Sequence, residues 1–178
     1  MKKFCIFVLI ATLSCIAKAQ VVDESYTYDD MNKVYWREPK VSVVIDNPDE
    51  IPPLKDSDIS MTVEPYGRSV VYFIKNLSDK KVYINWQTTF FSLNGKTMFC
   101  YINKYQNIKY IAKKATEVMR TEGEYGNILN VKPMKKEYAK TKTPVPFTVE
   151  VLFFVIYDDE EVKYKYVREG LYAPAPKK

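Results

Sequence analysis

The stretch from Ser69 to Tyr101 restricts the fold more than any other part of the chain. Ser69 to Lys75 is a nearly continuous apolar run, which is typical of a central strand covered on both faces. Asn76 to Lys80 is a polar turn, since Asn, Ser and Asp side chains hydrogen-bond to their own backbone there. Asn94-Gly95 is the strongest hairpin signal of the chain. Further strands are expected at 82–86, 88–93 and 97–102.

Alternating apolar and polar residues predict strands on both sides of this stretch, at 41–45, 59–63, 128–131, 144–157 and 162–167. In the strand at 144–157, one face is wholly apolar from Phe147 to Tyr157. The other face becomes apolar from Leu152 onward, so we expect its second half to be covered on both sides. Trp86 shares a face with Val82 and Ile84, which predicts a core position for its ring.

These strands predict an all-β protein with a single antiparallel β-sandwich of about seven to nine strands at 41–170 and at most one short helix. The helix would lie within 103–122, where apolar residues recur at roughly helical spacing, although Ile108–Ile111 fits a short strand as well. Met134–Thr143 is interpreted as a solvated, lysine-rich loop. Residues 20–40 are expected to form an N-terminal arm and residues 171–178 a flexible tail.

Residues 1–19 have the organisation of a secretory signal peptide. Two lysines precede a short apolar run, and Ala17-Lys18-Ala19 supplies the small residues that signal peptidase requires. We therefore expect export to the periplasm, cell surface or medium, with cleavage after Ala19 and no transmembrane segment in the mature chain. Lipidation of Cys15 is the alternative, but Leu13 lies one place too late for the usual motif.

The composition excludes several kinds of chemistry. The chain has no histidine, which removes His-activated nucleophiles and imidazole metal sites. Cys100 is the one cysteine outside the expected signal peptide, and its apolar neighbours favour an inert, buried thiol. Cleavage removes three lysines and no acid, so the net charge falls from +5 to +2 and a nucleic-acid partner is not expected. We predict neither enzymatic activity nor a cofactor.

Two acidic clusters are the remaining candidates for chemistry: Asp158–Glu161, and Asp46 with Asp49 and Glu50. Either could bind calcium weakly, or two carboxylates could serve as the acid and base of a glycosidase. Both clusters fall in expected turns, where acids are common because turns are hydrated. We therefore assign no catalytic residue and no metal ligand.

Tyr35 and Trp36, in the arm, are the candidate binding residues. Flat aromatic rings stack against sugars at many binding sites, so an exposed pair here would indicate a carbohydrate-binding module. The alternative is that the rings dock on the domain, as rings in ordered termini usually do. The exposure and relative orientation of Tyr35 and Trp36 distinguish these two interpretations.

The stretch from Ser69 to Tyr101 resembles small exported β-sandwich proteins of Gram-negative gut-type bacteria, a group without assigned function. The residues concerned are Asn76–Trp86 and Phe90–Gly95, about a fifth of the chain. The resemblance implies an immunoglobulin-like topology and a location outside the cytoplasm, and it implies no active site. We expect a non-enzymatic envelope or secreted protein that acts by binding a protein or glycan or by assembly.

Overall fold

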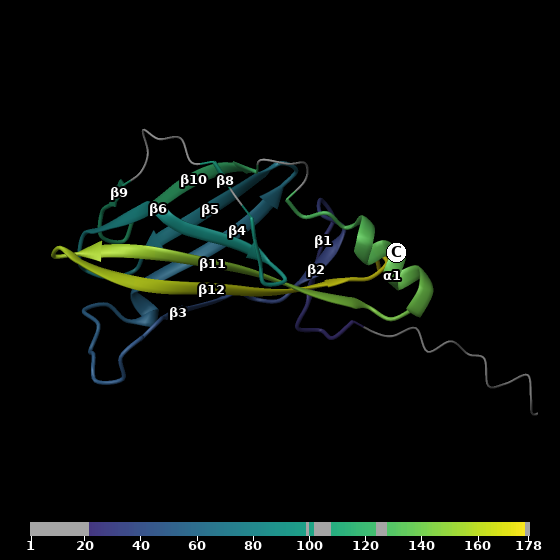
Figure 1. The fold of residues 1–178 in the computed structure, drawn as a ribbon, viewed down its shortest axis with the longest axis horizontal. Coiled ribbons are helices and arrows are strands. Elements are labelled where there is room, and N and C mark those ends of the chain that lie inside the picture. The colour runs from purple at the N-terminus through teal and green to yellow at the C-terminus, as the bar shows by residue number, and fades with distance from the viewer. Residues whose placement is uncertain (1–21, 99, 102–107, 124–127, 177–178) are drawn as a thin grey trace, which may run out of the picture.

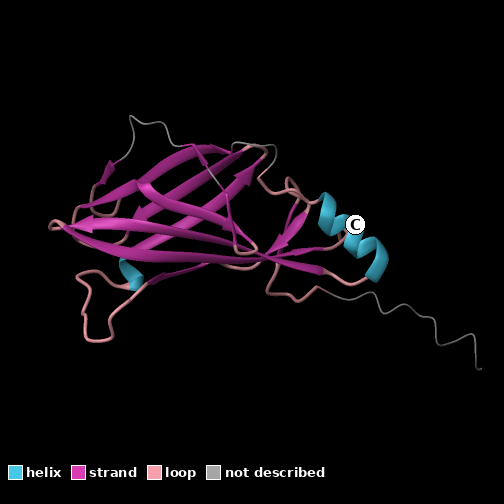
Figure 2. Ribbon diagram, in the orientation of Figure 1, coloured by secondary structure: helices cyan, strands magenta, loops and turns pink. Residues whose placement is uncertain are grey.

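The computed structural model describes residues 22–98, 100–101, 108–123 and 128–176, so the expected signal peptide and Cys15 lie outside the described residues. Two antiparallel sheets form the fold (Figures 1 and 2). The large sheet has the order β1 (Thr27–Asp29), β2 (Val34–Trp36), β12 (Glu160–Tyr172), β11 (Val145–Tyr157), β6 (Val82–Leu93) and β7 (Lys96–Met98), with β3 (Lys40–Val43) beside β12 and β9 (Ile108–Ile111) beside β6. The small sheet has the order β4 (Ile59–Tyr66), β5 (Ser69–Asn76), β10 (Thr116–Gly123) and β8 (Cys100–Tyr101).

The predicted all-β sandwich is confirmed, with twelve strands in the described residues instead of seven to nine. The additional strands include β1 and β2 in the arm, for which three residues give too little alternation to be recognised. The immunoglobulin-like topology stays a prediction.

One apolar core lies between the sheets, because each sheet turns an apolar face toward the other. Trp86 is completely buried in it and its ring lies 5.4 Å from that of Tyr72, as its position in the strand pattern predicted. Burying a ring of this size contributes about 2–3 kcal/mol. Residues of β11 and of the facing strands β4 and β5 supply much of the rest: Phe147, Val149, Val151, Phe153, Val155, Ile59, Met61, Val63, Val70 and Ile74.

Two tight hairpin turns set the register of the large sheet. Asn94 and Gly95 have φ values of 51° and 73°, and Asp158 and Asp159 have φ values of 49° and 66°. Two successive residues with positive φ are what a two-residue hairpin turn of type I′ requires. The Asn94-Gly95 prediction is confirmed, and the acidic turn joins β11 to β12 through the same geometry.

The strands expected at 82–86 and 88–93 are one strand, β6, interrupted by a bulge. Asn85 pairs with Phe154 and Phe90 pairs with Leu152, so four residues of β6 face the single Phe153 of β11. This insertion changes which residues face inward. Phe91 enters the core, whereas Phe90 points to solvent.

The single described α-helix, α1 (Lys132–Thr141), is not where the sequence predicted it. The predicted helix at 103–122 was wrong, because its described part forms β9 and β10; residues 103–107 lie outside the described residues. The alternative strand at Ile108–Ile111 is confirmed. Met134 and Tyr138, four residues apart, place the packing side of α1. Because only these two packing residues lie among the lysines of α1, its sequence has the pattern of a solvated loop.

The N-terminal arm joins the large sheet. β2 pairs with the end of β12, where Trp36 lies opposite Gly170, and Gly170 also lies opposite Phe147 on β11. Because Gly170 has no side chain, the rings of Trp36 and Phe147 meet edge to face with centroids 5.0 Å apart. The guanidinium of Arg168 lies 4.7 Å from the Trp36 ring centroid. Residues 22–39 are thus part of the sandwich.

The expected flexible tail was wrong for residues 171–174. Leu171 and Tyr172 complete β12, and Ala173 is buried. The hydroxyl of Tyr35 donates a hydrogen bond of 3.0 Å to the carbonyl of Pro174. The arm and the C-terminal residues therefore stabilise each other. The sequence of either segment alone does not indicate this contact.

A charged hydrogen-bond acceptor holds the hairpin of the arm together. Asp29 accepts hydrogen bonds from the backbone N–H groups of Met31 and Asn32, from the Asn32 amide and from Nε1 of Trp36, at 2.7–3.1 Å. Burial alone raises the pKa of Asp29, but these hydrogen bonds outweigh it and hold the pKa below 3.8. Asp29 therefore stabilises the docked arm in its ionised form.

We expect acid to release the arm. The stability that Asp29 supplies is present above its unfolded-state pKa, about 3.9, and is lost as pH falls through the lower folded-state value. Trp36 fluorescence should therefore shift to the red below about pH 4. Asp29→Asn should weaken docking at neutral pH, where the carboxylate is ionised, and remove most of this dependence on pH. Trp36→Phe identifies which tryptophan reports the change. An identical acid titration in Asp29→Asn would contradict this role.

Candidate binding face

The structure buries both candidate binding residues of the arm. Tyr35 is 8% exposed and Trp36 is 4% exposed, and each ring contacts another aromatic ring. They therefore form no exposed platform for a sugar, and the docking interpretation agrees with the structure. Asp29 and Trp36 also line a hollow of about 450 Å³ beside the arm. There, the Trp36 Nε1–H donates its hydrogen bond to Asp29 and is not offered to a ligand.

The side of the large sheet turned away from the core is the candidate site, and we call it the outer face. Strand alternation and the bulge in β6 place its residues, because every neighbour of a core residue points outward. Its members are Tyr83, Asn85, Phe90 and Ser92 of β6, Glu150, Leu152, Phe154 and Ile156 of β11, Glu161, Lys163, Lys165 and Val167 of β12, Tyr110 of β9 and Val44 after β3.

Large apolar side chains of the outer face are open to solvent. Phe90 is 53% exposed, Tyr110 is 52% exposed and Tyr83 is 38% exposed. Leu152, Phe154 and Ile156 are only half-buried, so the prediction that this half of the strand is covered on both of its faces was wrong. Among the described residues no second layer lies over them. The sequence showed correctly that this half of β11 is apolar on both faces, but not that one face stays open.

Strand register makes these side chains neighbours. Tyr110 lies opposite Tyr83, which lies opposite Ile156, and the two tyrosine rings are 5.6 Å apart at 53°. Phe90 lies opposite Leu152 on the same face. Opposed residues on adjacent strands are about 5 Å apart. Leu152, Phe154 and Ile156 follow one another on this face of β11 and connect Phe90 to the tyrosine pair, so the exposed rings belong to one apolar surface.

The loop at 44–55 projects from the sheet (Figure 1). A groove lies beside it on the outer face. One hollow of about 530 Å³ is lined by Phe90, Leu152 and Lys165, and a second of about 610 Å³ lies between Phe154 and the loop. Val44 and Lys163 line both hollows, so the two lie next to each other and together form the groove.

The loop beside the groove is fixed at its base. Leu54 is fully buried, and the carbonyls of Pro53 and Lys55 accept hydrogen bonds from Lys80 Nζ at 3.0 Å and from the Tyr164 hydroxyl at 2.9 Å. Burial, together with the nearby carboxylates of Asp58 and Asp56, raises the pKa of Tyr164, which keeps its hydroxyl a donor. The tip remains open, with Ile51 exposed beside Pro52.

Three polar pairs lie at the outer face. Lys163 Nζ lies 3.1 Å from Asp46, Lys165 Nζ lies 3.2 Å from Glu150, and the Asn85 amide donates 2.9 Å to Glu161. Exposed pairs such as these add little stability. The second hollow keeps an excess of negative charge, because Asp46, Glu50, Glu160 and Glu161 line it against Lys163 alone. The hollow at Phe90 and Leu152 carries fewer charges and is mainly apolar.

The groove brings together the two acidic clusters that the sequence singled out. Asp46 and Glu50 come from the loop, and Glu160 and Glu161 come from the start of β12, all at the second hollow. Within the described part of the chain, no three acidic or cysteine side chains are grouped so that they could hold a metal ion. Cys100 belongs to β8, and its side chain lies outside what the structure describes.

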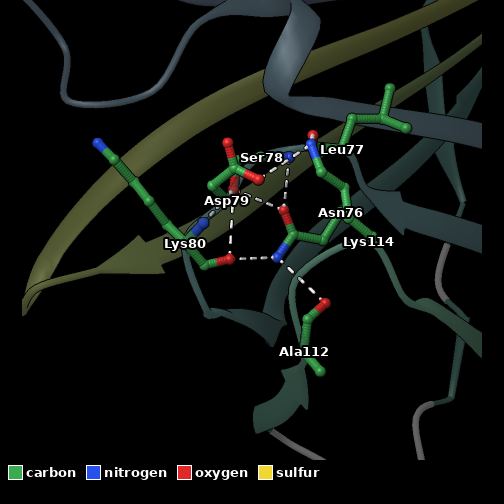
Figure 3. Close-up of polar contacts among 7 residues, drawn as sticks. All are labelled: Asn76, Leu77, Ser78, Asp79, Lys80, Ala112 and Lys114. Atoms are coloured by element: carbon green, nitrogen blue, oxygen red, sulfur yellow. Dashed lines mark hydrogen bonds and ion pairs between the residues drawn. The ribbon is translucent and has the colours of Figure 1, made fainter.

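A second polar cluster, around Asn76, is saturated by its own bonds (Figure 3). The Asn76 amide donates to the carbonyls of Lys80, Ile111 and Ala112 at 2.6–3.3 Å, and its oxygen accepts from the backbone and hydroxyl of Ser78 at 3.0 and 2.7 Å. Asn76 is completely buried. Because every hydrogen-bonding position of its side chain is used, this cluster holds the turn and has no capacity for a ligand.

Sequence reasoning missed Tyr83, Phe90 and Tyr110 as functional candidates. The signal for Tyr83 was present, since Lys81, Tyr83 and Asn85 share the face opposite Val82 and Ile84. Phe90 could not be placed, because the bulge reverses its side, and Tyr110 lies where the secondary structure was ambiguous.

The described residues define an all-β, two-sheet protein whose large sheet has a groove on its outer face. No family model matches the chain, and a search of curated proteins found no match. Among solved structures, the chain is similar to a protein from Archaeoglobus fulgidus at 10% identity and a TM-score of 0.36, over 80% of this chain and 99% of that one. No helix among the described residues is both long and apolar enough to cross a membrane.

Proposed function

We propose that this chain is an exported, non-enzymatic protein that binds a protein partner through the outer face. The observation that carries the proposal is the exposure of Phe90, Tyr83 and Tyr110 on one continuous apolar surface. Large apolar patches on monomers usually mark interaction sites. Phe90 and Leu152 line the less charged end of the groove, where Lys165 pairs with Glu150, so the best-fitting partner presents an apolar protein segment there. Export is supported by the pattern of residues 1–19.

Site-specific photo-cross-linking in the native cell tests this function. A cross-linking amino acid at position 90 should capture a defined protein. The same amino acid at position 118 should not, since Val118 is equally exposed, at 53%, but lies on the outer side of the small sheet. Tyr110→Ser should weaken capture at position 90 at least several-fold without unfolding the protein, because Tyr110 is exposed. Equal capture at both positions, or none at position 90, contradicts the proposal.

Carbohydrate binding is the second candidate, and one observation favours it. Tyr83 and Tyr110 form an exposed ring pair, and the hydrogen-bonded Asn85 and Glu161 lie on the same face. Rings supply apolar contact to a sugar and polar groups bond its hydroxyls. This function predicts a glycan-array signal that Tyr110→Ala removes, with no protein cross-link at position 90.

A further inference from the structure

Most of the net charge of the chain is concentrated on α1 and its C-terminal cap. Residues 132–142 contain five lysines and one acid, a charge of +4 in a chain whose total is +5. All five lysines are exposed. None of them forms an ion pair with any acid in the part of the chain that the structure describes.

Helix geometry arranges these lysines in a row. Lys132, Lys136 and Lys140 follow each other at intervals of four residues, so they lie along one side of α1 over about 12 Å. Met134 and Tyr138 lie on the opposite side, where Met134 is buried and the Tyr138 ring meets that of Tyr172 at 6.2 Å. The apolar side of α1 is therefore occupied by its own protein. The row of lysines, which we call the lysine face, points to solvent.

The position of α1 in the molecule makes the lysine face accessible. The helix lies at one end of the sandwich, beside the last described residues of the chain and opposite the β11–β12 turn (Figures 1 and 2). No described strand continues beyond it. A flat partner can therefore approach α1 without contacting the outer face.

This arrangement is unfavourable for the isolated helix. Equal charges four residues apart repel each other, here twice, between Lys132 and Lys136 and between Lys136 and Lys140. Lysines in the first turn also oppose the positive end of the helix dipole, and no acid lies in that turn. An anionic partner relieves both effects, because its charge neutralises the lysines and interacts favourably with the positive end of the dipole.

We propose that the lysine face docks on an anionic lipid bilayer, with the lipid phosphates as the groups bound. With Lys135 and Lys142 beside it, the lysine face belongs to a group of five exposed lysines, which is enough for salt-dependent attraction to a bilayer. The exposed side of α1 carries no aromatic ring on which a nucleic-acid base could stack. Because Met134 and Tyr138 pack inward, the helix adheres through charge alone and does not insert. This inference is independent of the function proposed for the outer face.

Vesicle co-sedimentation of the chain from residue 20 onward tests the proposal, since every described strand and helix lies within that part. Vesicles of equal parts phosphatidylglycerol and phosphatidylcholine should bind it at low salt. High salt, or phosphatidylcholine alone, should abolish binding. The variant Lys132→Gln/Lys136→Gln/Lys140→Gln should bind about a hundredfold more weakly, at roughly fivefold per lysine.

A second triple variant controls for net charge. Lys75→Gln/Lys81→Gln/Lys113→Gln removes the same charge from exposed positions around the Asn76 turn. This turn joins β5 to β6 at the end of the sandwich away from α1. It should retain binding within a few-fold, and circular dichroism should show both variants folded. Equal losses in the two variants, unchanged binding in the first, or tighter binding of duplex DNA than of the vesicles overturns the proposal.

Discussion

Gly170→Ala will detach the N-terminal arm and destabilise the protein by about 3 kcal/mol, near the upper end of what overpacking costs. A Cβ at this position would lie 2.1 Å from Cζ of Phe147 and 2.4–2.6 Å from its two Cε atoms. The ring cannot move aside, because it is 3% exposed and meets Trp36 edge to face. The added methyl group therefore displaces the ring that seats the arm.

Urea unfolding and limited proteolysis measure the two parts of this effect. The variant should lower the unfolding midpoint and make residues 22–39 sensitive to protease under native conditions. Gly67→Ala is the matched control: a Cβ there meets nothing within 4 Å, so only the cost of its φ of 59° remains, about 1 kcal/mol. Adding Phe147→Leu to Gly170→Ala should recover part of the loss. Equal stabilities of the variants at 170 and 67 would show that Gly170 has no role in docking the arm.

The second large effect is expected for Asn76→Asp. The Asn76 amide nitrogen faces three carbonyl oxygens, so a carboxylate oxygen in its place faces only acceptors while fully buried. An unpaired buried charge of this kind costs about 3–5 kcal/mol. The turn at 76–80 and the start of β6 should lose protection from hydrogen exchange first.

The pH dependence of Asn76→Asp separates charge from shape. Burial against carbonyls raises the pKa of the new carboxyl in the folded state, so its cost grows as pH rises above its unfolded-state value, about 3.9. Below that pH the protonated carboxyl can donate to one carbonyl, and the gap from the unmutated protein should narrow. Asn94→Asp is the control. Its side-chain oxygen already accepts from the Thr148 N–H at an exposed turn, so little change is expected. A penalty for Asn76→Asp that does not vary with pH would reject the charge explanation.

Local signals in the sequence were sufficient for most of the sandwich. Asn94-Gly95, the alternation along β11 and the position of Trp86 each depend on near neighbours, and all three were predicted correctly. The arm was harder, because its docking depends on Gly170, which is more than 130 residues away from Trp36. The sequence around a single glycine in a strand does not indicate which distant residues will pack against it.

The candidate site could be predicted only in part, for a physical reason. Apolar character on both faces of β11 was visible, but whether a second layer covers a face is decided by tertiary structure. The bulge in β6 exchanged Phe90 and Phe91 between solvent and core without any glycine or proline to signal it. The lysines of α1 hid its two packing residues, so the helix that presents them looked like a solvated loop.

The pairing of Trp36 with Gly170 has a consequence for the order in which the molecule is completed. The N-terminal segment leaves the ribosome first, yet the strand on which it docks is among the last to emerge. Until β12 has been made, the aromatic residues of the N-terminal segment have no surface to pack against, and they remain available to chaperones. The Tyr35 hydroxyl and the Pro174 carbonyl, 139 positions apart, can join only after the chain has been made as far as Pro174. Closure of the arm therefore requires that β12 and the residues just after it are present.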